Sequence, residues 1–339
     1  DNESETFFNE SKFFIDHSNS EIEIQKIITS FEKNTNEYID NINLMIDSPK
    51  MLSIGISISK KLDGSKLRQT NVQFLIQEAK QQILKYYANY KVAHIIINNY
   101  KIDNIDYSYL PDNIESHFIS LDIIFICLPS DIVRYYKNIF SKSNILINQV
   151  VCSSYVKSIN YKNNQNLTGH LSFIDIGFNK TSIISYFNSK TLFFEVLPIG
   201  GNNITKDISK ILGIDLEQAE QLKLNFNQDY KSLSDNDTSA GDLEKVIFAR
   251  TEEILELCIK SIKSNLFIPD EFKMVLTGEG SKILDNRYKN KISFSNNINF
   301  SEETLEDICQ SGFKFGTGLN KQEVIVVPKK QIKQGFFEK

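Results

Sequence analysis

The chain has 339 residues, and chains of this length usually fold around more than one hydrophobic core, so two or more domains are expected. Hydrophobic residues make up 41% and charged residues 24%, and the formal net charge of -5 indicates neither nucleic acid nor an anionic membrane as a partner. No stretch reaches the roughly 20 apolar residues of a membrane-spanning helix, and no signal peptide opens the chain. These features predict a cytoplasmic, multi-domain globular protein.

The four cysteines and four histidines are scattered and show no paired metal-ligand spacing. Three cysteines lie inside apolar stretches, namely Cys127, Cys152 and Cys258. The sequence therefore predicts buried free thiols in a reducing compartment and no metal site built directly by protein side chains.

The first half of the chain alternates predicted strands and helices. Ser20 and Glu23 form a capping-box pattern ahead of a helix that runs to about Phe31. Further helices are predicted at 72–83, 129–140 and 153–159. Strands are predicted at 13–15, 52–58, 92–98, 118–128 and 145–151. This order is typical of a mostly parallel or mixed sheet with helices packed on it.

The second half predicts three consecutive strands, then helices and one more strand. The strands are expected at 171–177, 181–186 and 192–197, and the later one at 273–276. Helices are expected at 204–212, after the Asp215–Gln218 cap, and at 242–264, 301–310 and 311–319. The polar stretch 229–241 reads as an exposed loop. Both halves cluster strands ahead of helices, which suggests a duplicated two-domain plan.

Three glycine-containing turns are the candidates for chemistry. Asp175 ends a strand before the Gly177 turn, where its carboxylate could orient a metal-bound water and turn amides could approach phosphate. Gly200-Gly201 and the segment Thr277 to Ser281 each join a strand to a helix, as phosphate or ribose sites do. A plain hairpin and ordinary helix-entry turns remain the alternatives.

Taken in order, these motifs resemble the FtsA family of bacterial cell division proteins, which belongs to the actin-like ATPase superfamily. The resemblance spans roughly residues 13–320 and is specific in the second half. The segments that carry it are Asp175 to Gly177 with Thr181-Ser182, Pro198 to Ile208, Glu217 to Lys223, Ala249 to Ile254, and Val275 to Ser281.

The resemblance implies an α/β, actin-like (ribonuclease H-like, duplicated) two-lobed fold with ATP and Mg²⁺ between the lobes. The implied subdomains are 1A at 1–46 and 122–167, the inserted 1C at 47–121, 2A at 168–205 and 272–328, and 2B at 206–271. Residues 329–339 would lead toward a membrane helix. Residue by residue, it implies a catalytic role for Asp175, and it places a cofactor at Asp175, Gly177, Thr181, Gly200, Gly201, Asn202, Glu220, Lys223, Gly278, Gly280 and Ser281.

The implied function is to self-associate into filaments and to anchor FtsZ filaments, the Z ring, to the inner face of the cell membrane at the division site. Arg250 would pair with the acidic C-terminal peptide of FtsZ, and an intrachain salt bridge with Glu253 is the alternative. Residues 47–121 would bind other division proteins, and no nucleic acid is implied. Other functions that the fold allows are a small-molecule kinase and a pilus-assembly scaffold.

Three departures from the family pattern qualify the expectation. Phe178 and Asn179 stand where the family has glycines, so ATPase activity is expected to be weak or absent. The first phosphate loop has no counterpart, and the chain begins at Asp1 rather than Met, which suggests trimming. Gln334 to Lys339 resembles only the first turn of an amphipathic membrane helix, and an exposed tail is the alternative.

Overall fold

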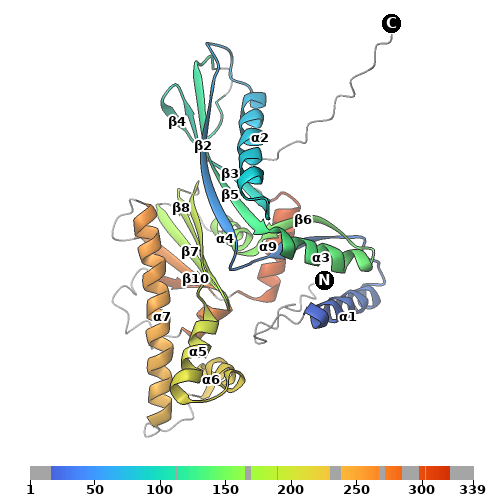
Figure 1. Cartoon of the computed structure of the whole chain (residues 1–339), viewed down its shortest axis with the longest axis vertical. Coiled ribbons are helices and arrows are strands. Elements are labelled where there is room, and N and C mark those ends of the chain that lie inside the picture. Colours follow the sequence, from blue (N-terminus) through green and yellow to red (C-terminus); the bar gives the residue numbers. More distant parts are fainter. Residues whose placement is uncertain are drawn as a thin grey trace. The chain divides into compact units, whose positions relative to one another are not determined.

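The computed structural model describes residues 17–111, 114–164, 169–188, 190–229, 238–266, 272–284, 298–301 and 303–320 (Figure 1). They form two compact units. Unit 1 takes the described parts of 1–54, 89–94 and 126–321, and unit 2 takes 55–88 and the described parts of 95–125. The strand predicted at 13–15 and the tail at 329–339 lie outside the described residues.

Unit 1 contains a five-stranded sheet with the order β11-β10-β7-β8-β9. Tight turns connect β7, β8 and β9 as an antiparallel meander, β10 is parallel to β7, and β11 is parallel to β10. Their bounds are β7 (His170–Ile176), β8 (Thr181–Phe187), β9 (Lys190–Leu197), β10 (Lys273–Thr277) and β11 (Ile298–Phe300). A parallel neighbour needs a long crossover, and the segment between β9 and β10 supplies it.

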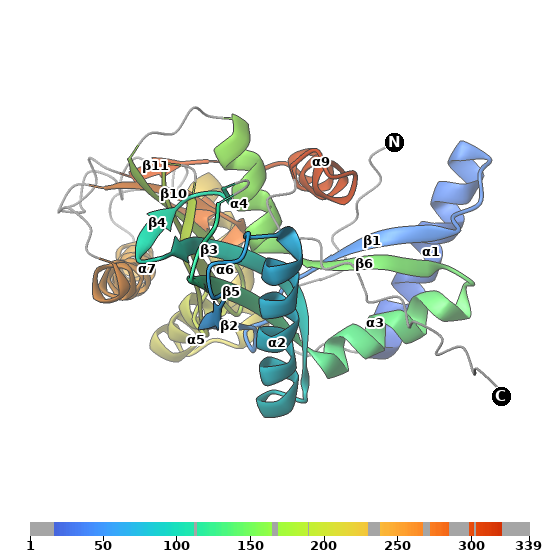
Figure 2. The ribbon, with the colours of Figure 1, turned by 90° about the horizontal axis from the view of Figure 1, so that it is seen from above.

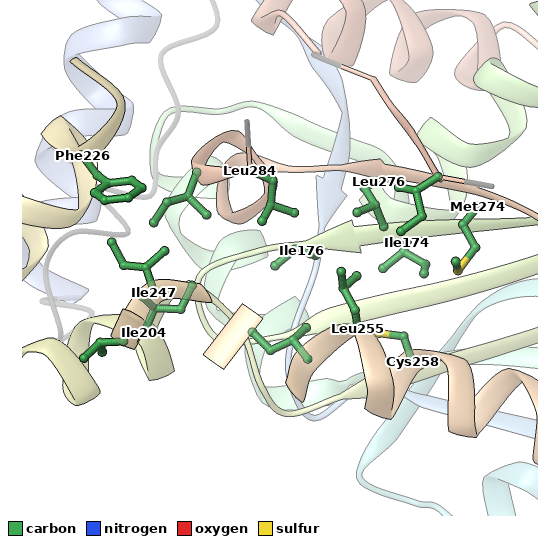
Figure 3. Close-up of a cluster of buried hydrophobic side chains, with 14 of the residues drawn as sticks. Ile174, Ile176, Ile204, Phe226, Ile247, Leu255, Cys258, Met274, Leu276 and Leu284 are labelled. Carbon is green, nitrogen blue, oxygen red and sulfur yellow. The ribbon is translucent and has the colours of Figure 1, made fainter. Parts of the chain in front are cut away.

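That crossover contains three helices, α5 (Gly201–Leu212), α6 (Leu216–Asp229) and α7 (Thr238–Asn265). Side chains of a strand alternate between the two faces of a sheet. Ile174 and Ile176 therefore point to the same face, where they join buried residues of the helices, such as Ile247 and Leu255, in one apolar core (Figure 3). Asp175 lies between the two isoleucines and so points to the opposite face.

A second part of unit 1 is built on the parallel pair β1 (Asn41–Ile46) and β6 (Leu146–Cys152), which run side by side in Figure 2. Its helices are α1 (His17–Thr35), α3 (Ser130–Lys142), α4 (Ser153–Asn164) and α9 (Leu305–Gly316). Lys142 of α3 pairs with Glu21 of α1 at 2.6 Å. Gly312 of α9 lies directly over the Met45 side chain of β1, and the absence of a Cβ there permits the close approach.

Unit 2 is a four-stranded sheet with the order β2-β5-β3-β4 and one helix, α2 (Gln69–Tyr86). Its strands are β2 (Leu52–Lys61), β3 (Tyr90–Ile102), β4 (Ile105–Tyr107) and β5 (Phe118–Pro129), and the boundaries of the unit fall within β2, β3 and β5. The α2 face predicted from helical spacing is the buried one, with Leu75, Ile76 and Ala79 fully shielded from solvent. The unit lies largely within the predicted inserted subdomain at 47–121, whose function stays a prediction.

The structure differs from the predicted elements in several places. β1 was not predicted, because Asn41 and Asn43 interrupt its apolar run. α7 begins at Thr238, within the stretch predicted as a loop. The two helices predicted at 301–310 and 311–319 are one helix, α9, whose N-terminus is capped by the Thr304 hydroxyl. The short strands β4 and β11 and the 3-10 helix η1 (Glu279–Ile283) were also not predicted.

Candidate functional site: converging glycine turns and a buried ionic cluster

The glycine turns predicted to bind a cofactor lie side by side at the end of β7. The Gly201 amide donates to the Gly177 carbonyl at 2.9 Å, and the Asn202 amide donates to the Phe178 carbonyl at 2.7 Å. A Cβ atom placed on Gly280 would lie 3.1 Å from the same Gly177 carbonyl. Three segments distant in sequence therefore meet at one point.

Gly278 is the tightest of these approaches. Its φ is +89°, and a Cβ atom there would overlap with Asp175 Oδ1 and lie 2.5 Å from the Ile176 carbonyl oxygen. Only glycine adopts this backbone conformation readily and fits this space. Ser281 stabilises the turn by donating its hydroxyl to the Gly278 carbonyl at 2.7 Å.

Glu220 and Lys223, two of the predicted cofactor residues, lie one turn apart on α6 and form a buried ion pair of 2.7 Å. The Lys223 ammonium also donates to Thr205 Oγ1 at 2.9 Å and to the Gly201 carbonyl at 3.2 Å. It lies 5.2 Å from the centre of the Phe178 ring, a cation–π distance. The Phe178 that departs from the family pattern is thus buried beneath this ammonium group.

Thr181 and Asn202 hold the hairpin against α5. The Thr181 hydroxyl donates to the Ile199 carbonyl at 2.8 Å, and the Asn202 side-chain amide donates to Asn179 Oδ1 at 2.8 Å. Asn179 therefore replaces the flexible glycine of the family pattern with a side chain that is tied to α5. All eleven predicted cofactor residues belong to this cluster of turns and to the first helices beside it.

Asp175 lies in a buried ionic cluster that sequence reasoning did not find. Asp175 Oδ2 is 3.0 Å from Lys157 Nζ, and Lys157 is also 2.9 Å from Glu303 Oε2. Lys180 Nζ lies 3.0 Å from Asp47 Oδ2 and 3.9 Å from Asp175 Oδ2. The Lys157, Lys180 and Asp175 side chains are each less than a tenth exposed, so three carboxylates and two ammonium groups share one poorly solvated place.

Two serines complete this cluster. The Ser154 hydroxyl lies 2.6 Å from Asp47 Oδ2 and 3.0 Å from the Ser182 hydroxyl. Lys180 donates to both of these hydroxyls at 2.8 Å. Ser182 is the direct partner of Asp175 in the β7–β8 pairing, so both side chains emerge on the sheet face that α4 covers.

The cluster perturbs the pKa values of Asp175 and Lys157. Burial alone would raise the pKa of Asp175, but Lys157 and Lys180 outweigh burial and hold that pKa at about 2. Burial alone would lower the pKa of Lys157, but Asp175 and Glu303 outweigh it and raise that pKa. Since the Asp175 pKa falls on folding, the pairing stabilises the protein above pH 3.8, and this stability is lost as the pH falls toward 2.

The arrangement does not fit a Mg²⁺ ion at Asp175. A magnesium site needs carboxylate oxygens that are free to face the ion or its water ligands. Asp175 Oδ2 instead faces two ammonium groups, and Gly278 closes over Oδ1. Among the described residues, no group of three or more acidic, histidine or cysteine side chains is arranged to hold a metal.

Arg250 lies on α7 and is held by two carboxylates of the same chain. Its Nε is 2.5 Å from Asp207 Oδ2, and its Nη1 is 2.6 Å from Glu253 Oε2. The intrachain salt bridge that was the alternative interpretation is therefore present, with a second partner on α5. About a quarter of the Arg250 side chain remains exposed, so its guanidinium is still accessible from solvent.

The cluster residues that were not predicted have only weak signals in the sequence. Lys157 follows Tyr155-Val156 and precedes Ile159, and a lysine inside a largely apolar helix is a sign of a buried charge. Lys180 stands directly before β8, where the patterning marks it only as a turn residue. Asp47 follows the unpredicted strand β1, and Glu303 lies 128 positions after Asp175, so neither could be connected with it from the sequence.

Comparison with solved structures defines the class of the protein. The chain superposes on a protein of the "PilM-PilN type IV pilus biogenesis complex" with a TM-score of 0.60 at 12% identity, covering 88% of this chain and 82% of that one. This likeness and the mixed α/β architecture show that the chain has an actin-like fold.

None of the described helices is long and apolar enough to cross a membrane.

Comparison with sequences narrows the class to a family. The profile of the family "Cell division protein FtsA" matches residues 172–316. FtsA of Borreliella burgdorferi is 22% identical, with 78% of this chain and 74% of the relative covered, and FtsA of Buchnera aphidicola (subsp. Acyrthosiphon pisum) is 22% identical with 89% and 82% covered. FtsA of Bacillus subtilis is 33% identical over a shorter region, 32% of this chain and 28% of the relative. The chain is thus similar to FtsA cell division proteins, through the family profile over residues 172–316 and through relatives aligned over most of its length.

Proposed function

We propose that this chain is an FtsA-type adaptor that self-associates through its actin-like lobes and anchors FtsZ filaments to the inner face of the cell membrane at the division site. The observation that carries the proposal is the FtsA family match over residues 172–316. That segment contains α5, α6 and α7 together with the five-stranded sheet against which they pack. Neither a kinase nor a pilus scaffold finds comparable support, because the curated relatives are FtsA proteins.

ATP is the cofactor that the similarity to FtsA implies, and we propose that it serves as a structural ligand rather than as a substrate for hydrolysis. The glycine turns and the Glu220–Lys223 pair support this choice because they meet at one point of unit 1. Turnover is not expected, since Phe178 and Asn179 are fixed by contacts with α6 and α5. A bound nucleotide would then contribute to the shape of the protomer within a filament.

FtsZ is expected to bind through its acidic C-terminal peptide at the exposed side of α7, near Arg250. A carboxylate of the peptide would compete with Asp207 and Glu253 for the guanidinium group. Such an exchange replaces one ion pair by another, so its contribution to affinity is modest and sensitive to salt. Apolar contacts between the peptide and its surroundings would supply the remaining affinity.

The test is fluorescence anisotropy with a labelled C-terminal peptide of FtsZ from the same bacterium. We expect saturable binding that weakens as salt rises, and a loss of about fivefold to tenfold for Arg250→Ala. Lys245→Ala is the matched control, because Lys245 lies on the same helix with its side chain 79% exposed. Failure of the unmodified chain to bind the peptide would remove the adaptor proposal.

Membrane attachment and binding of other division proteins are separate parts of the proposal. The segment Gln334 to Lys339, with its two phenylalanines beside lysines, lies outside the described residues and would enter the headgroup region. Flotation with vesicles that contain phosphatidylglycerol, using the natural full-length protein, tests the first part. Pull-down of division proteins by the intact chain, with and without substitutions on α2 of unit 2, tests the second.

A further inference from the structure

We propose that Lys157 is a built-in cation that takes the place of a divalent metal at Asp175 and locks the β1–β6 part of unit 1 to the five-stranded sheet. The inference concerns the same site as the proposed nucleotide, but it depends only on side chains of this chain. It therefore holds or fails independently of FtsZ binding.

The first argument is geometric. Lys157 and Ser154 come from α4, which follows directly from β6, and Asp47 follows directly from β1. Asp175, Lys180 and Ser182 come from the β7–β8 hairpin, on the sheet face opposite to the apolar core. The ion pairs Lys157–Asp175 at 3.0 Å and Lys180–Asp47 at 3.0 Å therefore cross between the two parts in opposite directions.

The second argument is the charge balance. Asp47, Asp175 and Glu303 carry three negative charges, and the two lysines carry two positive charges, so the ammonium groups neutralise most of the cluster. The Asp175 side chain is 5% exposed, and a buried carboxylate without a cation is strongly disfavoured. In this chain the Lys157 side chain supplies the required positive charge.

The third argument is competition for the same oxygen. A divalent ion coordinated by Asp175 would have to displace the Lys157 ammonium from Oδ2 and push it into a shielded region, where its only remaining ion-pair partner among the described residues is Glu303. The displaced ammonium would lose the attraction that holds its charge in a buried place. Because Lys157 is part of the chain, its ammonium group competes with a metal ion for Asp175 at all times.

The experiment measures thermal unfolding of the chain without nucleotide, in EDTA and in millimolar MgCl₂ or MnCl₂. We expect the melting temperature of the unmodified chain to be the same in all three solutions, and its titration into Mn²⁺ to leave the electron paramagnetic resonance signal of free Mn²⁺ unchanged. Stabilisation by either metal, or loss of the free Mn²⁺ signal, would overturn the inference. This arm needs no variant.

The second arm tests Lys157 itself. Lys157→Met keeps most of the side-chain volume and removes the charge, and we expect the melting temperature to fall by about 10 °C. Lys157→Arg keeps the charge, so its melting temperature should fall less. Lys282→Met is the matched control, because Lys282 pairs with Glu279 on the surface and half of its side chain is exposed. We expect the double variant Lys157→Met, Glu303→Gln to recover part of the loss, since it removes one stranded carboxylate.

Two results in this arm would overturn the inference. One is a Lys157→Met variant with the same melting temperature as the unmodified chain and the Lys282→Met control. The other is a double variant no more stable than Lys157→Met, because the loss would then come from packing and not from charge. Loss of FtsZ peptide binding in the unmodified chain would leave these outcomes unaffected and would count only against the adaptor function.

Discussion

Gly278→Ala is the substitution that most directly tests whether the glycine turn after β10 closes over Asp175. Gly278 has φ +89° and ψ 161°, a backbone region that is essentially restricted to glycine and costs another residue about 1–3 kcal/mol. The new methyl group would also overlap with Asp175 Oδ1 and approach the Ile176 carbonyl oxygen to 2.5 Å, and overpacking of this kind costs about 1–3 kcal/mol. We expect a loss of about 2–6 kcal/mol in the free energy of unfolding.

Two further glycines separate the contributions to that loss. Gly213 ends α5 with φ +66°, and no atom lies within 4 Å of the position that a methyl group would take there, so Gly213→Ala should cost only the backbone term of about 1–2 kcal/mol. Gly55 of β2 has neither a positive φ nor a close neighbour, so Gly55→Ala should be close to neutral. The excess of Gly278→Ala over Gly213→Ala then measures the close approach to Asp175.

The assay is urea unfolding followed by circular dichroism, with hydrogen exchange of β10 and β7 peptides to assign the loss to unit 1. Increased exchange in these two strands is expected for Gly278→Ala and not for Gly55→Ala. If Gly278→Ala costs no more than Gly213→Ala, the turn does not close over Asp175, and the convergence of the glycine turns is refuted. The same result would remove the structural support for a nucleotide at this place.

Three other outcomes follow from burial within unit 1. Leu255→Ala should cost about 2–5 kcal/mol in urea unfolding, because Leu255 is fully buried in the core, whereas Leu257→Ala on the exposed side of α7 should cost less than about 1 kcal/mol; equal losses would contradict the assigned face. Burial lowers the pKa of Lys162 to about 8, so between pH 8 and 10.5 the unfolded chain binds more protons than the folded chain, and the free energy of unfolding rises with pH. Lys162→Met should abolish this rise. A rise that persists in the variant would contradict the lowered pKa of Lys162. The half-buried Cys309 should be the first thiol to react with Ellman's reagent in the native protein, since burial raises the pKa of Cys127 and Cys258 to about 12; rapid reaction of either would contradict their burial.

Much of the fold could be predicted from local patterns. The prediction of a strand-rich second half was correct, because β7, β8 and β9 are short segments rich in β-branched and aromatic residues and are separated by turn residues. The Asp215 cap of α6 was also correct, since the Gln218 amide donates to Asp215 Oδ1 at 2.8 Å. β1 was missed because the asparagines that interrupt it lie on an exposed side of the strand, which a pattern search reads as polar.

The sequence by itself indicated the actin-like fold and the similarity to FtsA proteins, because glycine turns and strand–helix order are local features that survive at low identity. It also marked Asp175, whose position at a strand end is a local property. Only the tertiary structure decided what faces that carboxylate. Lys157 reaches it because α4 covers the sheet face opposite to the apolar core, and Lys180 reaches it from the turn between β7 and β8. The pairing of Lys157 with Asp175 depends on the packing of distant segments across a sheet face, which no local pattern encodes.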